Sequence, residues 1–542
     1  MRTKLTAMVI ATVFTLTAML TGCGSGNQNT NTSQSSTTKN EGTSSTGKTE
    51  SKGNKTLIFA QGSDPRGLDP AYVDDGESSK IICNVYEGLV KYKADSTELE
   101  PCLATSWDIS KDGKEYTFKL RQGVKFHDGT PFNADAVKFS VERQLPPNVK
   151  EDMPYASFTF DPNVVDKVEK VDDLTVKFIL KSPYTPFLAN LAMSLAAPIV
   201  SPEAVKKANG NLNESPVGTG PFKFVKWDKG QSITLEKNND YWGDKAKADK
   251  VVFKFTKENA VRASELMTGA VDMIDGVDPN DVKKLEDSKM KIFKDKGMNI
   301  NYMLFNCSRP PFNDPKLRQA VSHAINREEL VKFLYQGYAD LANTQMPSFI
   351  PGYNSKVQPY NYDPEKAKAM LKELGKEGLK IKMIAYSNPR PYNPVNGQKL
   401  AEAVQNYLSK VGITATIEVS PWKEYKAKIG QGEGDIGFYG WIGDNGDADN
   451  FLSLLDSKEI KSTLNAAKYT STEVDKLLAL ARTLPNGNDR VKAYQDVQEI
   501  AAKEAPWLPI SYALNMAAYS PKIKNFRVHP TGNVFLKDVD KE

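Results

Sequence analysis

Cysteine and histidine are scarce in this chain, which has four cysteines and three histidines among 542 residues. The cysteines are Cys23, Cys83, Cys102 and Cys307, and the histidines are His127, His323 and His529. No CxxC pair, zinc spacing, HExxH motif or GxSxG nucleophile elbow occurs in the sequence. We therefore expect no metal, no cofactor and no enzymatic activity, and keep a secreted hydrolase only as a remote alternative.

The chain also has little net charge, with a formal value of +4 and no dense run of Lys and Arg. This balance excludes nucleic acid as an expected partner. Hydrophobic residues make up 39% and charged residues 25% of the chain, as is typical of a soluble globular protein. Because the length exceeds what one hydrophobic core supports, we expect at least two lobes with a cleft between them.

The N-terminus has the pattern of a secretory signal. Arg2 and Lys4 precede an apolar run over residues 7–20, which is short for a membrane span and ends in Leu20-Thr21-Gly22-Cys23. These four residues resemble the lipobox of bacterial lipoproteins, which implies a signal peptide over residues 1–22 and Cys23 as the lipid anchor. The alternative is an uncleaved hydrophobic anchor. In both cases the body lies outside the cytoplasm, on the outer face of the cell membrane.

Residues 23–54 consist almost entirely of small polar residues, Lys and Glu, and this composition predicts a disordered tether. Residues 42–49 match the phosphate-loop pattern by letter. We reject this match because a phosphate loop needs a hydrophobic strand before it and a helix after it. If Cys23 is lipidated, three cysteines are left, so at most one disulfide forms and at least one thiol stays free.

The body begins with hydrophobic patterns of two kinds. Residues 56–60 are strand-like, and apolar residues at helical spacing predict a helix over residues 78–88. The apolar residues are Ile82, Val85, Tyr86 and Leu89. The loop between the two elements, residues 69–76, is rich in turn formers, and loops often contain functional residues.

A β-α-β unit is predicted further along the chain. Its pattern indicates a strand over 379–385, a helix over 400–411, a strand over 413–419 and then a further strand over 435–441. Arg390 follows the first strand in a proline-rich loop, and Asp444 follows the last strand in an acidic loop over 443–450. Ligands bind beyond the carboxyl ends of strands in open α/β sheets, so a cation and an anion are placed where they can face one cleft.

Several motifs, in order along the chain, resemble one family. They are Ala104-Thr105-Ser106-Trp107, the block from Asp112 to Phe132 with Phe126-His127-Asp128-Gly129-Thr130, Gly218-Thr219-Gly220-Pro221-Phe222, Tyr241-Trp242-Gly243 and Arg318-Gln319-Ala320-Val321-Ser322-His323-Ala324-Ile325-Asn326. From residue 55 onwards the chain is similar to the extracytoplasmic solute-binding proteins of peptide and nickel ABC importers, solute-binding protein family 5. The resemblance implies an ABC permease and ATPase as partners.

Two segments resemble the dipeptide-binding branch, Arg390-Pro391-Tyr392-Asn393-Pro394 and the stretch over 440–447. The resemblance implies that Asp444 holds the α-ammonium and Arg390 the α-carboxylate of a peptide. It also implies backbone contacts at Pro391, Tyr392, Trp441, Ile442, Gly443, Val73, Asp74 and Asp75. Asp74 and Asp75 depart from the hydroxyl residues of that branch.

Physical reasoning supports this assignment, because every peptide has one ammonium, one carboxylate and an extended backbone. Charge-assisted hydrogen bonds to these termini contribute about 1.5–3 kcal/mol each. Trp441 and Tyr392 offer apolar walls that tolerate varied side chains. We therefore expect short peptides, above all dipeptides, as the ligand.

Several alternatives stay open. The acidic loop is also compatible with a solvated turn, and Arg390 with a structural ion pair. A calcium loop is disfavoured because no EF-hand spacing follows. Longer oligopeptides, a nickel–chelator complex or an oligosaccharide are alternative ligands for the same scaffold.

The expected fold is an α/β, two-lobed, periplasmic-binding-protein-like clamshell of class II, with an extra subdomain on the first lobe. By resemblance, lobe I comprises residues 55–86, 205–287 and 506–542, the extra subdomain 87–204, and lobe II 288–505. Hinge strands join the lobes, which close over the ligand. We expect a monomer.

Overall fold

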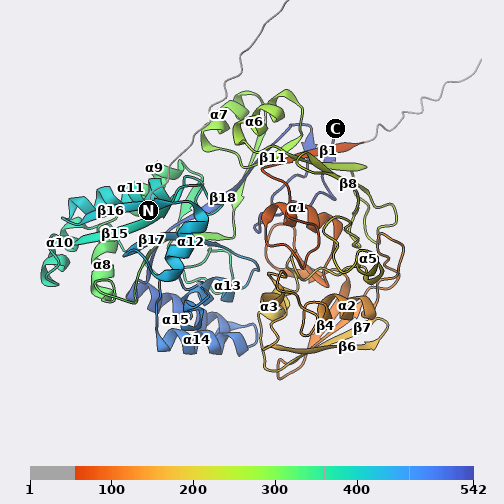
Figure 1. Cartoon of the computed structure of the whole chain (residues 1–542), viewed down its shortest axis with the longest axis horizontal. Coiled ribbons are helices and arrows are strands. Elements are labelled where there is room, and N and C mark those ends of the chain that lie inside the picture. The colour runs from red at the N-terminus through yellow and green to blue at the C-terminus, as the bar shows by residue number, and fades with distance from the viewer. Residues whose placement is uncertain (1–54, 359, 463) are drawn as a thin grey trace, which may run out of the picture. The chain divides into compact units, whose positions relative to one another are not determined.

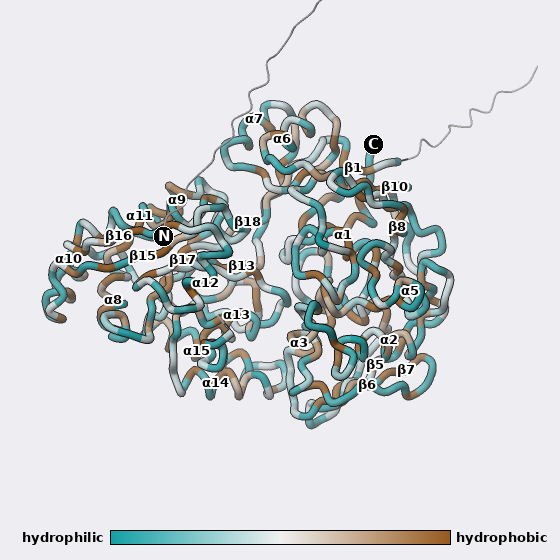
Figure 2. The backbone as a smooth tube through the Cα atoms, in the orientation of Figure 1, coloured by the Kyte–Doolittle hydropathy of each residue, from teal (hydrophilic) through white to brown (hydrophobic). Residues whose placement is uncertain are grey.

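The computed structural model describes residues 55–358, 360–462 and 464–542. The predicted signal peptide, the anchor Cys23 and the tether lie outside these residues. Both strands and helices occur throughout the described chain (Figure 1). Hydrophilic and hydrophobic stretches occur in every part of it, as expected for elements that bury only one face (Figure 2). The mixed α/β class predicted from the sequence is confirmed.

The second lobe, as we call the part built around a core from Met298 to Tyr512, contains most of the helices. Its strands are β13 (Asn299–Phe305), β14 (Ala339–Leu341), β15 (Lys380–Tyr386), β16 (Thr414–Ser420) and β17 (Ile436–Ile442). Its helices are α8 (Pro315–His323), α9 (Arg327–Tyr335), α10 (Pro364–Glu373), α11 (Gly397–Lys410), α12 (Trp422–Gln431), α13 (Asp449–Leu452), α14 (Thr472–Thr483) and α15 (Asn488–Glu504). The predicted β-α-β unit is confirmed as β15-α11-β16, with β15 parallel to β16.

The first lobe gathers segments that are far apart in sequence around a core that includes Leu57, Phe222 and Leu536. Its strands are β1 (Thr56–Gln61), β8 (Phe222–Asp228), β9 (Ser232–Lys237), β10 (Lys250–Phe255), β11 (Met273–Asp275), β12 (Lys291–Lys296), β19 (Ile523–Lys524) and β20 (Asp540–Lys541). Its helices are α1 (Gly76–Val85), α5 (Pro202–Lys207), α6 (Asn259–Thr268) and α7 (Val282–Asp287). Alternate residues of β1 enter different cores, because successive strand side chains point to opposite faces of a sheet.

An inserted subdomain has its own core, which spans Leu89 to Ile199. Its strands are β2 (Val90–Tyr92), β3 (Leu99–Pro101), β4 (Ala104–Ile109), β5 (Glu115–Leu120), β6 (Val165–Asp172) and β7 (Thr175–Leu180). Its helices are α2 (Ala134–Glu142), α3 (Ala156–Thr159) and α4 (Phe187–Asn190). A four-stranded sheet of order β4-β5-β7-β6 forms its centre. The exact domain boundaries given above stay a prediction.

One long strand, β18 (Trp507–Tyr519), connects the two lobes (Figure 1). Its first half pairs with β13 and its second half with β12, so it belongs to both lobes within one 12-stranded sheet. The chain also passes directly from β12 to β13 beside this strand. These neighbouring crossings are positioned to act as hinges, because few residues would have to change conformation for the lobes to rotate.

The helix predicted over 78–88 is shorter than expected at its C-terminal end. Asp75 caps the start of α1 by accepting a hydrogen bond from the Ser78 backbone N–H at 2.9 Å. The helix ends at Val85 because Tyr86 has extended backbone dihedrals. Leu89, which continued the apolar pattern, belongs to the core of the inserted subdomain instead.

Each cysteine of the described residues is a free thiol. Burial raises the pKa of Cys83 to about 12 and that of Cys307 to about 11, so both are protonated near neutral pH. Within residues 55–358, 360–462 and 464–542, no helix has the length and hydrophobicity needed to cross a membrane.

A buried ion pair joins the loop before α1 to the inserted subdomain. The Arg143 guanidinium donates to the Asp69 carboxylate at 2.8 Å, and Asp69 also accepts from the Leu212 N–H at 2.9 Å. We expect Asp69→Asn to lower the free energy of unfolding by about 3–5 kcal/mol, because it leaves a buried guanidinium without its partner. Guanidinium chloride unfolding checks this result. As a control, Arg66→Ala removes an exposed ion pair to Asp74 and is expected to cost less than about 1 kcal/mol.

Candidate ligand-binding site

A cavity of about 1230 Å³ is lined by residues from both lobes and the inserted subdomain. Almost every residue predicted to contact a ligand lines it. These residues are Asp74, Asp75, Arg390, Pro391, Tyr392, Trp441, Ile442, Gly443 and Asp444. Val73 is not among them, because its side chain is buried in the core of the first lobe.

The pairing of strands explains why the two predicted loops meet. β15 and β17 are parallel neighbours in the second-lobe sheet, so their carboxyl ends lie at the same edge. Arg390 follows β15 and Asp444 follows β17. The structure thus brings the predicted cation and the predicted anion to one cavity.

Arg390 lies in a tight turn closed by two backbone hydrogen bonds. The Arg390 N–H donates to the Asn393 carbonyl at 3.0 Å, and the Asn393 N–H donates to the Arg390 carbonyl at 2.8 Å. Its guanidinium carbon lies 4.2 Å from the centre of the Trp422 ring. Among the described residues no carboxylate forms an ion pair with it, and its buried Nε has no hydrogen-bond partner. The alternative that Arg390 forms a structural ion pair therefore has no carboxylate partner in the described chain.

An aromatic wall supports this guanidinium. Trp422 stacks on Tyr439 with centroids 5.6 Å apart and an interplanar angle of 24°, and Tyr392 is buried beside them. A Cβ at Gly440 would lie 2.3 Å from the Tyr392 ring, so only glycine allows this close approach. Stacking restricts the rotation of Arg390 and presents a fixed, planar donor group to the cavity.

The aspartates of the acidic loop have two different roles. Asp447 pairs with Arg490 at 2.8 Å and Asp449 pairs with Arg482 at 2.8 Å, both in largely buried positions. Asp444 has no cationic partner among the described residues. Asp447 and Asp449 therefore fix the loop, whereas Asp444 retains an uncompensated charge that faces the cavity.

The Asp444 carboxylate is held by neutral donors. The Tyr155 hydroxyl donates to its Oδ1 at 2.6 Å, and the Asn450 side-chain amide approaches its Oδ2 at 3.4 Å. Asn450 also accepts from the Trp441 indole N–H at 2.9 Å and from the Asp444 N–H at 3.0 Å. Burial raises the pKa of Asp444 to about 6, although the hydrogen bonds from Tyr155 and Asn450 oppose this rise.

This pKa makes binding of a cationic group dependent on pH. Asp444 is ionised above about pH 6, so affinity should be greatest near pH 7 and fall as the carboxylate is protonated at lower pH. A peptide α-amine loses its proton near pH 8, so affinity should also fall above that value. Calorimetry should show binding roughly tenfold weaker at pH 5 than at pH 7. Equal affinity at both values would contradict the predicted role of Asp444 in binding the ligand amine.

The carboxylates of the early loop form an ion pair and hydrogen bonds with other groups of the protein. Asp74 pairs with Arg66 at 2.5 Å, and Asp75 accepts from both the backbone N–H and the hydroxyl of Ser78. Their side chains are therefore engaged, which leaves the backbone of the loop for any ligand contact.

Several cavity residues were missed by the sequence interpretation. They are Tyr155, Trp422, Lys426 and Tyr439, together with Asn450, which positions Asp444. Trp422 follows β16 at the same sheet edge as Arg390, so the rule for carboxyl ends of strands could have found it. Tyr155 belongs to another part of the chain, and no local signal marks it.

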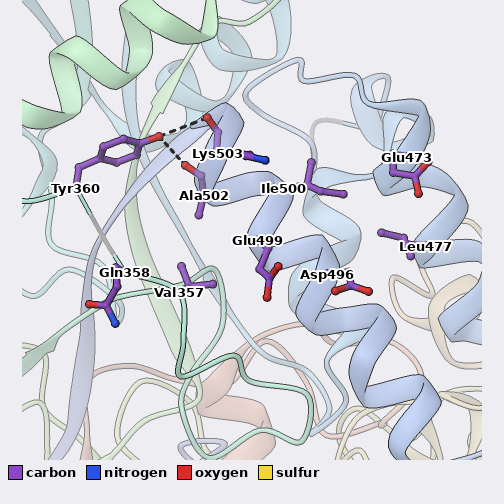
Figure 3. Close-up of a pocket in the computed structure, with 10 residues that line it drawn as sticks. All are labelled: Val357, Gln358, Tyr360, Glu473, Leu477, Asp496, Glu499, Ile500, Ala502 and Lys503. Carbon is purple, nitrogen blue, oxygen red and sulfur yellow. Dashed lines mark hydrogen bonds between the residues drawn. The ribbon is translucent and has the colours of Figure 1, made fainter.

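A second pocket of about 560 Å³ lies on the second lobe, beside α14 and α15 (Figure 3). It contains Glu473, Asp496 and Glu499 but none of the residues predicted to bind a ligand. In it the Tyr360 hydroxyl donates to the Ala502 carbonyl at 2.6 Å. No group of three or more potential metal ligands occurs within the described residues.

Comparison with known families places the chain among the extracytoplasmic binding proteins of transporters. Residues 98–463 match the model of the bacterial extracellular solute-binding proteins, family 5, middle part, and the chain belongs to this family. The prediction of a binding protein rather than an enzyme is thereby confirmed. The family also supports the expected association with an ABC transporter and a location outside the cytoplasm.

Known relatives cover almost the whole chain. Heme-binding protein A of Haemophilus influenzae is 37% identical over 90% of this chain and 93% of its own length. The dipeptide-binding protein of Escherichia coli is 36% identical over 90% of this chain and 95% of its own. An ABC transporter-associated periplasmic binding protein of Helicobacter pylori, solved with the peptide STSA, is 36% identical, covers 90% and 99% of the two chains and gives a TM-score of 0.75.

Proposed function

We propose that this protein captures di- and oligopeptides, mainly dipeptides, by their charged termini and delivers them to an ABC permease and its ATPase. The observation that supports this proposal most strongly is the pair Asp444 and Arg390. Each lines the same cavity and lacks a partner of opposite charge in the described chain. A peptide brings the two missing charges.

The electrostatics favour a ligand with two opposite ends. An unpaired charge at a partly buried site costs free energy, and a ligand ammonium or carboxylate offsets this cost by forming charge-assisted hydrogen bonds. The termini would be held at Asp444 and Arg390, while Trp441 and Tyr392 contact backbone and side chains. This arrangement recognises what all peptides share and leaves side chains variable.

The size of the cavity favours a second candidate, longer oligopeptides. Its volume of about 1230 Å³ exceeds the roughly 300–1,000 Å³ of common small-molecule pockets, so space remains beyond a dipeptide. Heme, named for one relative, and a nickel–chelator complex are further ligands to test.

Isothermal titration calorimetry of residues 54–542 tests the proposal. The ligands are a free dipeptide, its N-acetyl and C-amide forms, a pentapeptide, a nickel–histidine complex and hemin. We expect the free dipeptide to bind tightly and each blocked form to bind about 100-fold more weakly. Tight binding of only the pentapeptide, the nickel complex or hemin would leave the family assignment intact and overturn the proposal that dipeptides are the main ligand.

Membrane attachment through a lipid on Cys23 and a monomeric state are part of the same proposal. The motif Leu20-Thr21-Gly22-Cys23 supports the anchor. Expression of the full chain and its Cys23→Ser variant in a bacterial host, followed by fractionation, tests it. We expect the variant to leave the membrane fraction; retention there would contradict the anchor. Light scattering of residues 54–542 tests the monomer.

A further inference from the structure

The inserted subdomain contacts the acidic loop through three hydrogen bonds. The Tyr155 hydroxyl donates to the Asp444 carboxylate at 2.6 Å. The Gly446 N–H donates to the Tyr92 hydroxyl at 3.3 Å, and the Asn445 side-chain amide donates to the Asn190 side-chain oxygen at 2.5 Å. One of these bonds therefore ends on the group that we propose to hold the ligand ammonium.

The two oxygens of Asp444 are not equivalent. Oδ1 accepts the short bond from Tyr155, whereas Oδ2 receives only the long approach of the Asn450 amide at 3.4 Å. A carboxylate oxygen can accept more than one hydrogen bond, so Oδ2 has free capacity for a cation. Tyr155 also lines the cavity beside Asp444.

We propose that Tyr155 is a positioning residue for ammonium capture, which holds Oδ1 of Asp444 so that Oδ2 faces the ligand. This inference rests on the proposed function. Because Tyr155 and Asp444 belong to the inserted subdomain and the second lobe, their bond forms only when these parts approach each other. Capture of the ammonium and closure of the cavity are thus coupled through one carboxylate.

The surroundings of Asp444 support this assignment to Tyr155. The other charged groups of its loop, Asp447 and Asp449, are neutralised by Arg490 and Arg482. From the inserted subdomain, Tyr92 and Tyr155 are the titratable groups that interact with Asp444, and Asp74 of the early loop interacts with Tyr155. Tyr155 is the one among these that donates a hydrogen bond to the Asp444 carboxylate. Its hydroxyl favours the ionised form of Asp444, so its removal should make that carboxylate harder to ionise.

The test compares Tyr155→Phe with Asn190→Ala, which removes a neighbouring contact between the same parts. Calorimetry measures dipeptide affinity for both variants and the unaltered protein between pH 4.5 and 8. We expect Tyr155→Phe to lose about tenfold in affinity at pH 7. We also expect it to shift the acidic limb of the pH profile, the range in which affinity falls as the pH decreases, to higher pH. Asn190→Ala should leave the position of that limb unchanged. Thermal unfolding confirms that both variants are folded.

The outcomes separate the inference from the proposed function. Unchanged affinity of Tyr155→Phe, or weaker binding with an unshifted limb, would overturn the positioning role. An equal shift in Asn190→Ala would overturn it as well, because the effect would then come from closure in general. If the unaltered protein fails to bind the free dipeptide, the proposed function itself fails, and the same titration shows this first.

Discussion

Replacement of Asp444 by asparagine is expected to weaken binding of a free dipeptide by about 100-fold or more. Asparagine keeps the size of the side chain but replaces one acceptor oxygen with an NH2 donor and removes the charge that faces the ammonium. Loss of one member of a buried ion pair costs about 3 kcal/mol or more, which corresponds to a factor of this size. Isothermal titration calorimetry at pH 7 measures the effect.

Two controls show whether the loss of affinity comes from the missing contact between the Asp444 charge and the ligand ammonium. Asp74→Asn changes another aspartate that lines the same cavity but pairs with Arg66, so we expect less than a threefold effect. An N-acetyl dipeptide should bind Asp444→Asn and the unaltered protein about equally, because it brings no ammonium. An unchanged affinity of Asp444→Asn for the free dipeptide would refute the assignment of Asp444.

Replacement of Arg390 by methionine should have an effect of similar size at the other end of the ligand. Methionine retains much of the apolar contact with Trp422 and loses the donors that face the carboxylate. We expect a loss of about 100-fold for the free dipeptide and almost none for the dipeptide amide. Arg390→Lys should recover only part of the affinity, because an ammonium cannot form two parallel hydrogen bonds to a carboxylate.

Lys426 offers a matched control for this variant. Its ammonium lies 5.9 Å from the centre of the same Trp422 ring, and it also lines the cavity. Its side chain is exposed to solvent, so Lys426→Met should change affinity by less than a few-fold. A larger loss for Lys426→Met than for Arg390→Met would show that Lys426, and not Arg390, holds the ligand carboxylate.

Local sequence pattern was sufficient for the sheet that positions the site. The alternation over 379–385 and 413–419, with a helical stripe between them, specified β15-α11-β16 because each element buries one face. The rule for carboxyl ends of strands then placed the loops of Arg390 and Asp444 at one edge. These inferences needed only short-range periodicity and one general property of α/β sheets.

Contacts between distant segments could not be predicted in this way. Tyr155 is 289 residues from Asp444 in the sequence, and their contact depends on how the inserted subdomain meets the second lobe. The division of the acidic loop into paired and unpaired aspartates likewise depends on Arg482 and Arg490, which two later helices supply. The loop composition alone made all its aspartates look alike.

A crystal structure of residues 54–542 with a bound dipeptide tests the central claim most directly. We expect the ligand ammonium at hydrogen-bond distance from Oδ2 of Asp444, about 2.7–2.9 Å, with Tyr155 still donating to Oδ1. We also expect the ligand carboxylate on the Arg390 guanidinium above Trp422. A dipeptide bound in the cavity with its termini away from Asp444 and Arg390 would contradict both assignments.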